Sequence, residues 1–331
     1  MGVVGRSIPL PVKLARRLLE YHKLTVPFNL EELVKKHATL VYKTIPMTGI
    51  DGVTINLKVP GKVPKVVVNS NMPKTRQKFT LAHELGHIII PSHTGTIVDE
   101  IYTQDALNWQ YYFLEQEANV FAAELLMPTQ WVEEMYRKHS DNLEYLHFQI
   151  ASIAGVSDQA AAIRLIQILP PEIAFVAVEH GEIVNNGRTE LSTLRLQDRG
   201  SDFDSEHFKH VKHHSIYHSG LVLYHWYDLN AKTELRVSHD TRTWREILDS
   251  ILSTTIPLPD REQLRRSING VASAANSTAQ RNPNYSVEFL IVAITNRFQN
   301  RGDEFEKIVN HPDYETFVHK RAYDFFHKIK K

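Results

Sequence analysis

The sequence contains no cysteine, and this absence removes several kinds of chemistry at once. Disulfide frameworks, zinc sites with thiolate ligands and cysteine-based catalysis are all excluded. Any metal ion must therefore be held by histidine and carboxylate side chains. The composition supplies both types of ligand, with 18 histidines and 38 acidic residues in a chain of 331 residues.

The chain also lacks an excess of charge of either sign and lacks long apolar runs. Lys+Arg and Asp+Glu both number 38, so no overall basic field favours nucleic acid. No stretch approaches the ~18 apolar residues of a membrane span. Pro9 and Pro11 interrupt the N-terminus before a signal peptide could form, and Arg6 breaks an N-myristoylation motif. We therefore expect a cytoplasmic protein that does not bind nucleic acid directly.

One apolar stretch, residues 79–90, contains the pattern His-Glu-x-x-His. Because residues four apart lie on the same face of a helix, His83 and His87 can present two imidazoles to one ion. Glu84 leans toward the space beside that ion, where it can polarise a water molecule. Buried histidine and glutamate side chains are costly without partners. The pattern therefore indicates a zinc site on a helix that ends at Pro91.

A second helix is expected to return toward the first and to supply a third ligand. The helical period of apolar residues resumes after residue 110 and stops at Pro128. Glu117 falls inside this apolar face, where a carboxylate is either paired or a ligand. Glu124 shares the stripe, so spacing alone leaves both acids open, with a preference for Glu117. The remaining nearby acids are interpreted as surface charges: Asp99, Glu100 and Glu115.

Two motifs resemble those of a known family. They are residues 75–87, TRQKFTLAHELGH, and residues 117–128, EANVFAAELLMP. Together they resemble the ImmA/IrrE metallopeptidase family over roughly residues 10–170, with no departure in either motif. Arg76 and Asn119 also belong to the motifs, and we interpret both as structural.

The resemblance implies a ligand set and a mechanism. His83, His87 and Glu117 are expected to hold one Zn²⁺ ion, with Mn²⁺ as an alternative in vitro. Glu84 is expected to act as the catalytic base. Three nearby residues are chemically able to stabilise the oxyanion, and the sequence does not choose among them: His93, Tyr111 and Tyr112.

The resemblance also implies a fold and a function. The fold class is α+β, with a zincin-like metallopeptidase domain at residues 1–170. That domain combines a small antiparallel sheet, the HExxH helix and a helical bundle. The expected activity is that of a zinc endopeptidase cleaving one cytosolic protein, a helix-turn-helix repressor, in a stress, phage or mobile-element response. The alternative is a regulatory protein of a defence or toxin–antitoxin pair that binds its partner without cleaving it.

Pro170–Pro171 marks the predicted start of a second α+β domain, which covers residues 171–331. The role of this domain is unknown, and a sensor and a partner-docking module are the two candidates. It is expected to contain a hairpin turned at His180–Gly181 and several helices, with further strands at residues 221–227 and 235–237. In the first domain we expect strands at residues 39–43, 52–59 and 65–69, followed after Pro91 by an irregular acidic segment.

Two further patterns carry weaker signals. Residues 142–169 resemble a helix-turn-helix, but the second helix offers one arginine among alanines and isoleucines, so core packing is favoured over DNA recognition. Residues 207–218 hold five histidines. Such a stretch can form a second metal site, but a solvated face is the simpler interpretation.

Overall fold

The computed structural model describes residues 8–46, 49–100, 109–170, 172–190, 192, 194–208, 211, 213–228, 240–281, 285–299, 301 and 303–329. The chain divides into two compact units, Met1–Ile168 and Leu169–Lys331. Each unit combines helices with a four-stranded sheet, so the α+β fold class is confirmed. The placement of the domain boundary at Pro170–Pro171 stays a prediction.

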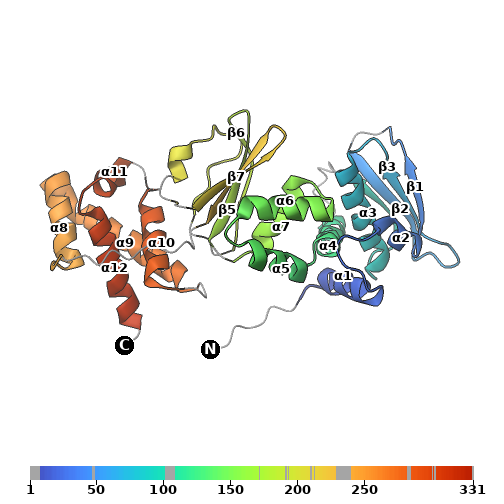
Figure 1. Cartoon of the computed structure of the whole chain (residues 1–331), viewed down its shortest axis with the longest axis horizontal. Coiled ribbons are helices and arrows are strands. Elements are labelled where there is room, and N and C mark those ends of the chain that lie inside the picture. Colours follow the sequence, from blue (N-terminus) through green and yellow to red (C-terminus); the bar gives the residue numbers. More distant parts are fainter. Residues whose placement is uncertain are drawn as a thin grey trace. The chain divides into compact units, whose positions relative to one another are not determined.

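The first unit places its sheet beside the HExxH helix, and most of its other helices follow that helix in the chain (Figure 1). Its elements, in chain order, are α1 (Leu10–Tyr21), α2 (Leu30–Lys35), β1 (Thr39–Lys43), β2 (Ile50–Leu57), β3 (Lys65–Asn69), α3 (Lys74–Ile89), β4 (Gly95–Glu100), α4 (Trp109–Leu126), α5 (Thr129–His139), α6 (Leu143–Ala154) and α7 (Asp158–Ile168).

The sheet of the first unit has the strand order β1-β3-β2-β4. β2 pairs antiparallel with β3 and with β4, whereas β1 pairs parallel with β3. The prediction of an antiparallel sheet is therefore wrong for β1, and β4 occupies a segment that was expected to be irregular. β-branched residues identify strands but not their order or direction. β1 pairs with the edge of β3 that faces away from β2.

α3 carries the HExxH motif against this sheet, and side-chain hydrogen bonds fix both of its ends. At its start, the Gln77 amide donates to the carbonyl oxygens of Ser70 and Met72 at 3.1 and 2.6 Å. At its end, the Lys58 ammonium donates to the carbonyl oxygens of His87 and Ile90 at 2.8 and 2.6 Å. A cation at a helix C-terminus satisfies otherwise unpaired carbonyl groups and complements the helix dipole.

A buried ion-pair network joins four helices of the first unit. Glu124 of α4 is 1% exposed and accepts hydrogen bonds from Arg16 of α1 at 2.7 Å and from Arg164 of α7. It also accepts from the hydroxyl of Thr129 of α5 at 2.7 Å. The sequence left Glu124 as one of two candidates for the third metal ligand, but all of these contacts engage its carboxylate. Glu124 is thus a structural residue of this network.

Replacing Arg164 with Met is expected to lower the free energy of unfolding by about 3 kcal/mol, because it leaves the buried Glu124 carboxylate short of a partner. Denaturant-induced unfolding followed by circular dichroism measures this loss. The matched control is Arg137→Met, since Arg137 is exposed on α5 and its Nε donates to Glu133 O of the same helix at 3.4 Å. The control should stay within about 0.5 kcal/mol of the wild type. Equal stability of the two variants would contradict a stabilising network.

α6 and α7 form the helix pair that resembles a helix-turn-helix. α6 is capped at its C-terminus by Gly155, whose φ of +59° is the left-handed conformation that glycine adopts without strain. In α7, Ala161, Ala162 and Leu165 are at most 1% exposed, and Arg164 is engaged by Glu124. α7 therefore contributes to the core of the unit, and its one arginine is held inside the protein.

The second unit consists of an antiparallel sheet followed by a helical part. Its elements, in chain order, are β5 (Ile173–Glu179), β6 (Glu182–Arg188), the 3₁₀ turn Ser205–Phe208, β7 (His213–Ser219), β8 (Val222–Asp228), α8 (Trp244–Thr255), the 3₁₀ turn Leu258–Asp260, α9 (Arg261–Ala279), α10 (Val287–Gln299), α11 (Asp303–Val309) and α12 (Tyr314–Ile329).

The sheet of the second unit has the order β6-β5-β8-β7, and all of its pairings are antiparallel. The predicted hairpin is confirmed: β5 and β6 are joined by His180 and Gly181, whose φ values of +51° and +86° are typical of a tight hairpin turn. β7 coincides with part of the histidine-rich stretch and was not predicted as a strand. The strand expected at residues 235–237 lies outside the described residues.

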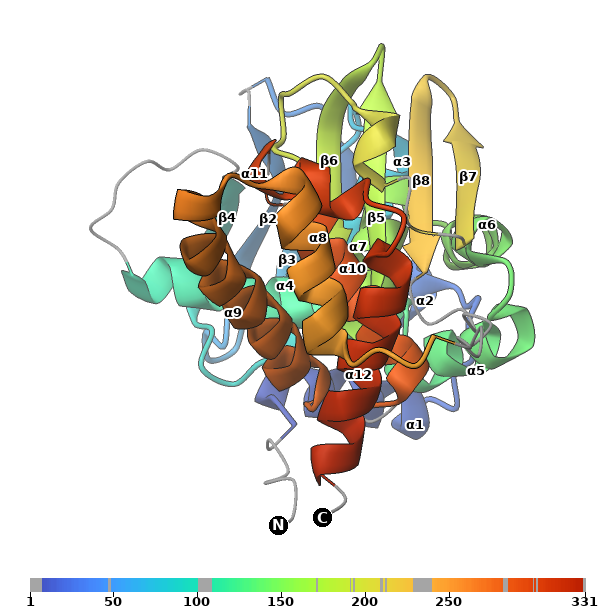
Figure 2. The same ribbon diagram turned by 90° about the vertical axis from the view of Figure 1, so that its left-hand side faces the viewer.

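The helices of the second unit pack around one apolar core. α8, α9, α10 and α12 lie side by side, and α11 connects α10 to α12 (Figure 2). Fully buried side chains from each helix meet in that core, including Ile251, Ile268, Leu290, Phe305 and Phe317.

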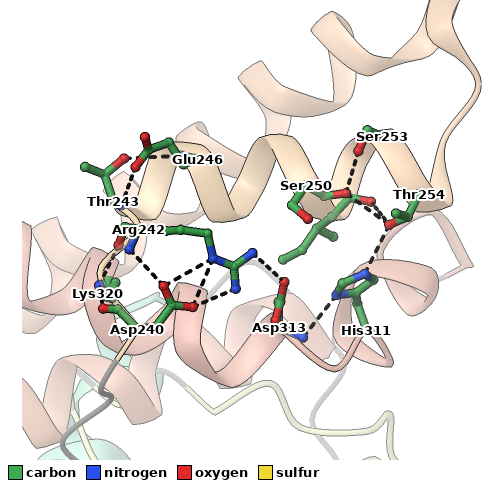
Figure 3. Close-up of polar contacts among 11 residues, drawn as sticks. Asp240, Arg242, Thr243, Glu246, Ser250, Ser253, Thr254, His311, Asp313 and Lys320 are labelled. Carbon is green, nitrogen blue, oxygen red and sulfur yellow. Dashed lines mark hydrogen bonds and ion pairs between the residues drawn. The ribbon is translucent and has the colours of Figure 1, made fainter.

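A polar network fixes the start of α8 (Figure 3). The Arg242 guanidinium binds the Asp240 carboxylate at 2.6 Å and the Asp313 carboxylate at 3.0 Å. The Lys320 ammonium on α12 donates to the carbonyl oxygens of Asp240 and Arg242. These contacts tie the segment before α8 to α12 and to the turn that precedes α12.

Among the described residues, no helix combines the length and the apolar content needed to cross a bilayer.

Candidate metal centre

Three potential metal ligands converge where α3 faces α4. His83 and His87 come from the HExxH turn, and their Nε2 atoms lie 2.9 Å apart. The carboxylate of Glu115 on α4 lies 3.0 Å from Nε2 of His83 and 3.4 Å from Nε2 of His87. One ligand atom from each of the three residues can be chosen so that all lie within 4.8 Å of one another. Two imidazoles and one carboxylate form a ligand set typical of catalytic zinc sites.

Glu115, rather than Glu117, is the acid beside the two histidines. The interpretation of Glu115 as a surface charge is wrong, since its side chain is 15% exposed and contacts both rings. Glu117 is more exposed, at 37%, and its carboxylate lies 3.1 Å from Nε2 of His93. The sequence contained a usable signal: Glu115 and Asn119 are four residues apart, so they lie on one face of α4 and both reach His83.

Asn119 orients the first histidine. Its Oδ1 lies 2.9 Å from Nδ1 of His83. Because an amide oxygen only accepts hydrogen bonds, Nδ1 of His83 carries the proton and Nε2 keeps its lone pair. That lone pair faces His87 and Glu115. Asn119, which we expected to be structural, therefore sets the ring tautomer of a candidate ligand.

The charges and polar atoms of this cluster fit a cation. Burial lowers the pKa of His87 to about 2, with the two neighbouring histidines and Lys58 adding to the effect. A neutral imidazole is the form that binds metals. Within the described residues, Oε1 of Glu115 is buried and has no hydrogen-bond donor. A neutral ring, an oriented lone pair and a carboxylate oxygen without a donor are electron-rich groups that a positive ion would satisfy.

Close helix packing brings these ligands together. A Cβ atom built on Gly86 of α3 would lie 3.1 Å from Cδ1 of Phe121 and 3.3 Å from Cα of Ala118, both on α4. These contacts are tighter than ordinary van der Waals contact, so a side chain at this position would require α4 to shift. Gly86 therefore allows the backbone approach that places Glu115 within reach of the two histidines.

His93 lies behind His87. Its ring is completely buried, with Nδ1 2.8 Å from Nδ1 of His87 and Nε2 3.1 Å from the Glu117 carboxylate. Burial lowers the pKa of His93, against the opposing effect of Glu117. Because both ring nitrogens already have partners, His93 has no donor left for an oxyanion. Of the three residues considered for that role, Tyr111 and Tyr112 stay predictions.

Glu84 is fully buried on the sheet side of α3. Its Oε2 accepts a short hydrogen bond from the Thr54 hydroxyl on β2. A Cβ atom built on Gly52, the preceding residue on that face of β2, would lie 2.5 Å from Oε1 of Glu84. Thr54 and Gly52 were not identified from the sequence. Thr54 holds the carboxylate by a hydrogen bond, and Gly52 leaves the space that Oε1 occupies.

Arg76, the other motif residue, forms an ion pair with Asp51 on β2, which is 1% exposed. This contact ties the start of α3 to the sheet.

The described residues of the histidine-rich stretch do not assemble a comparable site. His207 lies in the 3₁₀ turn, and His213, His214 and His218 lie on β7, while residue 210 is outside the described residues. Nε2 of His214 lies 3.0 Å from Nδ1 of His225 on β8, and the two rings stack. Where the structure is described, the group at α3 and α4 is the one that brings three potential ligands together.

Comparisons with known proteins cover this same half of the chain. Residues 40–166 match the family described as Peptidase M78, IrrE N-terminal-like domain. The "Radiation response metalloprotease IrrE" of Deinococcus deserti is 28% identical over 139 residues, which are 39% of this chain and 48% of that protein. The protein of the same name from Deinococcus radiodurans is 29% identical over 119 residues, 35% of each chain.

A phage protein is also similar. The "Uncharacterized immunity region protein 2" of Bacillus phage phi105 is 26% identical over 149 residues, 45% of this chain and 85% of that protein. The chain spans about half the length of the first of these relatives, at 48%. The family match, at residues 40–166, lies within the unit that contains α3 and α4.

Proposed function

Because residues 40–166 belong to the ImmA/IrrE family of metallopeptidases, we propose that this chain is a zinc-dependent endopeptidase. The observation that carries the proposal is the convergence of His83, His87 and Glu115, with Glu84 next to His83 in the same HExxH turn of α3. The sequence predicted the two histidines and Glu84 in these roles. For the third ligand we replace Glu117 by Glu115, because Glu115 is the acid that contacts both rings.

The ligand set supports one divalent ion. Two imidazole nitrogens and a carboxylate suit Zn²⁺, and Mn²⁺ is a substitute that accepts the same donors. When bound, such an ion supplies Lewis-acid polarisation of the peptide carbonyl. Asn119 and Gly86 keep the histidines and Glu115 arranged to hold it.

Glu84 moves the protons of the reaction. Its carboxylate takes a proton from the attacking water as the water oxygen bonds to the carbonyl carbon of the substrate. It then delivers this proton to the amide nitrogen as the C–N bond breaks, so the amine leaves neutral. The Thr54 hydroxyl donates to Oε2 and positions the carboxylate. A carboxylate positioned in this way approaches the water in one orientation, which reduces the entropy cost of each transfer.

Replacing Gly52 with Ala is expected to lower peptidase activity about 100-fold while leaving metal binding intact. The added methyl group would clash with Oε1 of Glu84 and with Cγ2 of Thr80, at 2.5 and 2.6 Å, and displace the carboxylate. Displacements near 1 Å cost about 100-fold in rate. Cleavage kinetics and metal titration of the same preparation measure both quantities. The matched control is Gly270→Ala on α9, where a Cβ meets nothing within 4 Å. Full activity in Gly52→Ala would mean that the Glu84 carboxylate does not need its observed position.

The substrate we propose is a helix-turn-helix repressor, cleaved in response to stress or during a phage or mobile-element response. The support is the family resemblance, together with the radiation-response and immunity-region names of the relatives. The second unit, which lies outside the family match, is proposed to sense the signal or to dock the partner. The cytoplasmic location follows from this substrate and stays a prediction.

Incubation of the purified chain with each small helix-turn-helix repressor of its source genome tests the proposed activity. We expect a single cut in the repressor, loss of the cut after chelation, and recovery on addition of Zn²⁺. An intact repressor under all conditions, together with a stable complex of the two proteins, would favour the alternative of a regulatory protein that binds without cleaving.

A further inference from the structure

A line of hydrogen bonds leads away from the candidate metal centre and ends at Glu117. Nδ1 of His87 lies 2.8 Å from Nδ1 of His93, and Nε2 of His93 lies 3.1 Å from the Glu117 carboxylate. The His87 and His93 rings are completely buried, and their centroids are 4.8 Å apart. Three side chains from α3, the following turn and α4 are thus linked in series.

The partners fix which nitrogens carry protons along this line. A carboxylate only accepts hydrogen bonds, so Nε2 of His93 must donate to Glu117. In the neutral ring of His93, Nδ1 is then an acceptor. The hydrogen bond between the two Nδ1 atoms therefore has His87 as its donor, which leaves the lone pair of His87 on Nε2.

We propose that Glu117 and His93 are positioning residues that set the ring tautomer of His87, so that Nε2 of His87 is directed as a lone pair toward His83 and Glu115. The proposal deepens the proposed function, and it rests on that function only for the role of His87 as a metal ligand. It also gives Glu117 a role, since this acid lies next to the site without contacting the candidate ligand atoms of the two HExxH histidines.

The other tautomer of His87 shows why its ring needs to be positioned by His93 and Glu117. If Nδ1 of His93 donated to His87, then His87 would carry its proton on Nε2, pointing at Nε2 of His83, 2.9 Å away. The ring would then offer no lone pair to an ion. Asn119 prevents this arrangement for His83 by a direct hydrogen bond. For His87, the equivalent restraint comes from Glu117 through His93.

The tautomers can be observed directly in the metal-free full-length chain. Long-range ¹H–¹⁵N correlation spectra of ¹⁵N-histidine-labelled protein separate the two tautomers, and the His87→Ala variant assigns the His87 signals. We expect the Nδ1–H tautomer for His87 and the Nε2–H tautomer for His93 in the wild type. In Glu117→Leu and in His93→Leu, we expect His87 to shift toward the Nε2–H tautomer.

Metal affinity gives a second measurement. Loss of an outer-shell partner typically weakens metal binding about 10- to 100-fold, and we expect that loss in Glu117→Leu and His93→Leu, measured by competition with a chromogenic chelator. Glu117→Gln should recover most of the affinity, because its amide oxygen still accepts from Nε2 of His93. The matched control is Gln116→Leu, an exposed neighbour on α4 that should leave affinity and tautomers unchanged.

The outcomes separate the proposal from the proposed function. An Nδ1–H tautomer of His87 that persists in both leucine variants would overturn the positioning role, whatever the activity of the protein. A merely structural role would lower thermal stability in the leucine variants but would not be rescued in affinity by Glu117→Gln. If the tautomers respond as expected while the wild type cleaves no repressor, the proposed function fails and the positioning role stands.

Discussion

Glu84→Gln is expected to bind metal as tightly as the wild type and to lose between about 100- and 10,000-fold in peptidase rate. A glutamine keeps the volume of the side chain and can still accept from the Thr54 hydroxyl, but it cannot take a proton from water. The expected range is the usual contribution of general acid–base catalysis. Steady-state cleavage of the repressor, combined with metal analysis of the same sample, separates the two effects.

Thr54→Val is the companion variant. It removes the hydroxyl that holds Oε2 of Glu84 and keeps the shape of the side chain. Its activity should fall between those of the wild type and Glu84→Gln, and Thr54→Ser should restore much of it. If the biological effect survived in Glu84→Gln without any cleavage, binding rather than proteolysis would be the function of the chain.

Glu115→Gln is expected to weaken Zn²⁺ binding by well over 100-fold and to abolish activity. It removes the carboxylate that faces both Nε2 atoms, whereas loss of an outer-shell partner typically costs about 10- to 100-fold. Competition with a chelator of known affinity measures the change. Unfolding without metal should be unaffected or slightly more difficult, because a buried carboxylate oxygen that lacks a donor is replaced by a neutral group.

Glu117→Gln is the matched control for Glu115→Gln, since the same change is made two residues along the same helix. Its carboxylate contacts His93 rather than the candidate ligand atoms of His83 and His87. We expect it to retain most of the metal affinity. A greater loss of affinity in Glu117→Gln than in Glu115→Gln would restore the ligand set that the sequence predicted.

The two histidines and Glu84 could be predicted from the sequence because their arrangement depends on local helix geometry. Residues four apart on one turn converge in any helix, whatever the rest of the fold does. The third ligand depends on how a second helix is rotated about its own axis. Glu117 and Glu124 share the apolar stripe of α4, and this stripe was the basis of the prediction. The metal-facing side of α4 lies at the edge of that stripe, with Glu115 and Asn119.

The positions of Thr54 and Gly52 could not be inferred from the sequence for a similar reason. Both lie on β2, and their contacts with Glu84 depend on the order of the strands under α3. β-branched segments separated by glycine and proline identified the strands but gave neither their order nor the parallel pairing of β1 with β3. Tertiary pairing decides these features, and a single sequence carries little information about them.

In the second unit, too, the features predicted from the sequence were those set by local sequence. The hairpin at His180–Gly181 was predictable because glycine and the residue before it adopt positive φ in tight turns. β7 was missed because its histidines and serines resemble a solvated segment, although the strand pairs with β8 along its whole length. Its hydrogen bonds with β8 come from the backbone and do not depend on an alternating apolar pattern.

The most direct test is a crystal structure of the zinc-loaded chain, with anomalous diffraction recorded at the zinc absorption edge. Our account predicts one peak within bonding distance, about 2.0–2.2 Å, of Nε2 of His83, Nε2 of His87 and an oxygen of Glu115. A zinc ion bonded to Glu117 or to the Nδ1 atoms, or a site that stays empty under zinc loading, would contradict it.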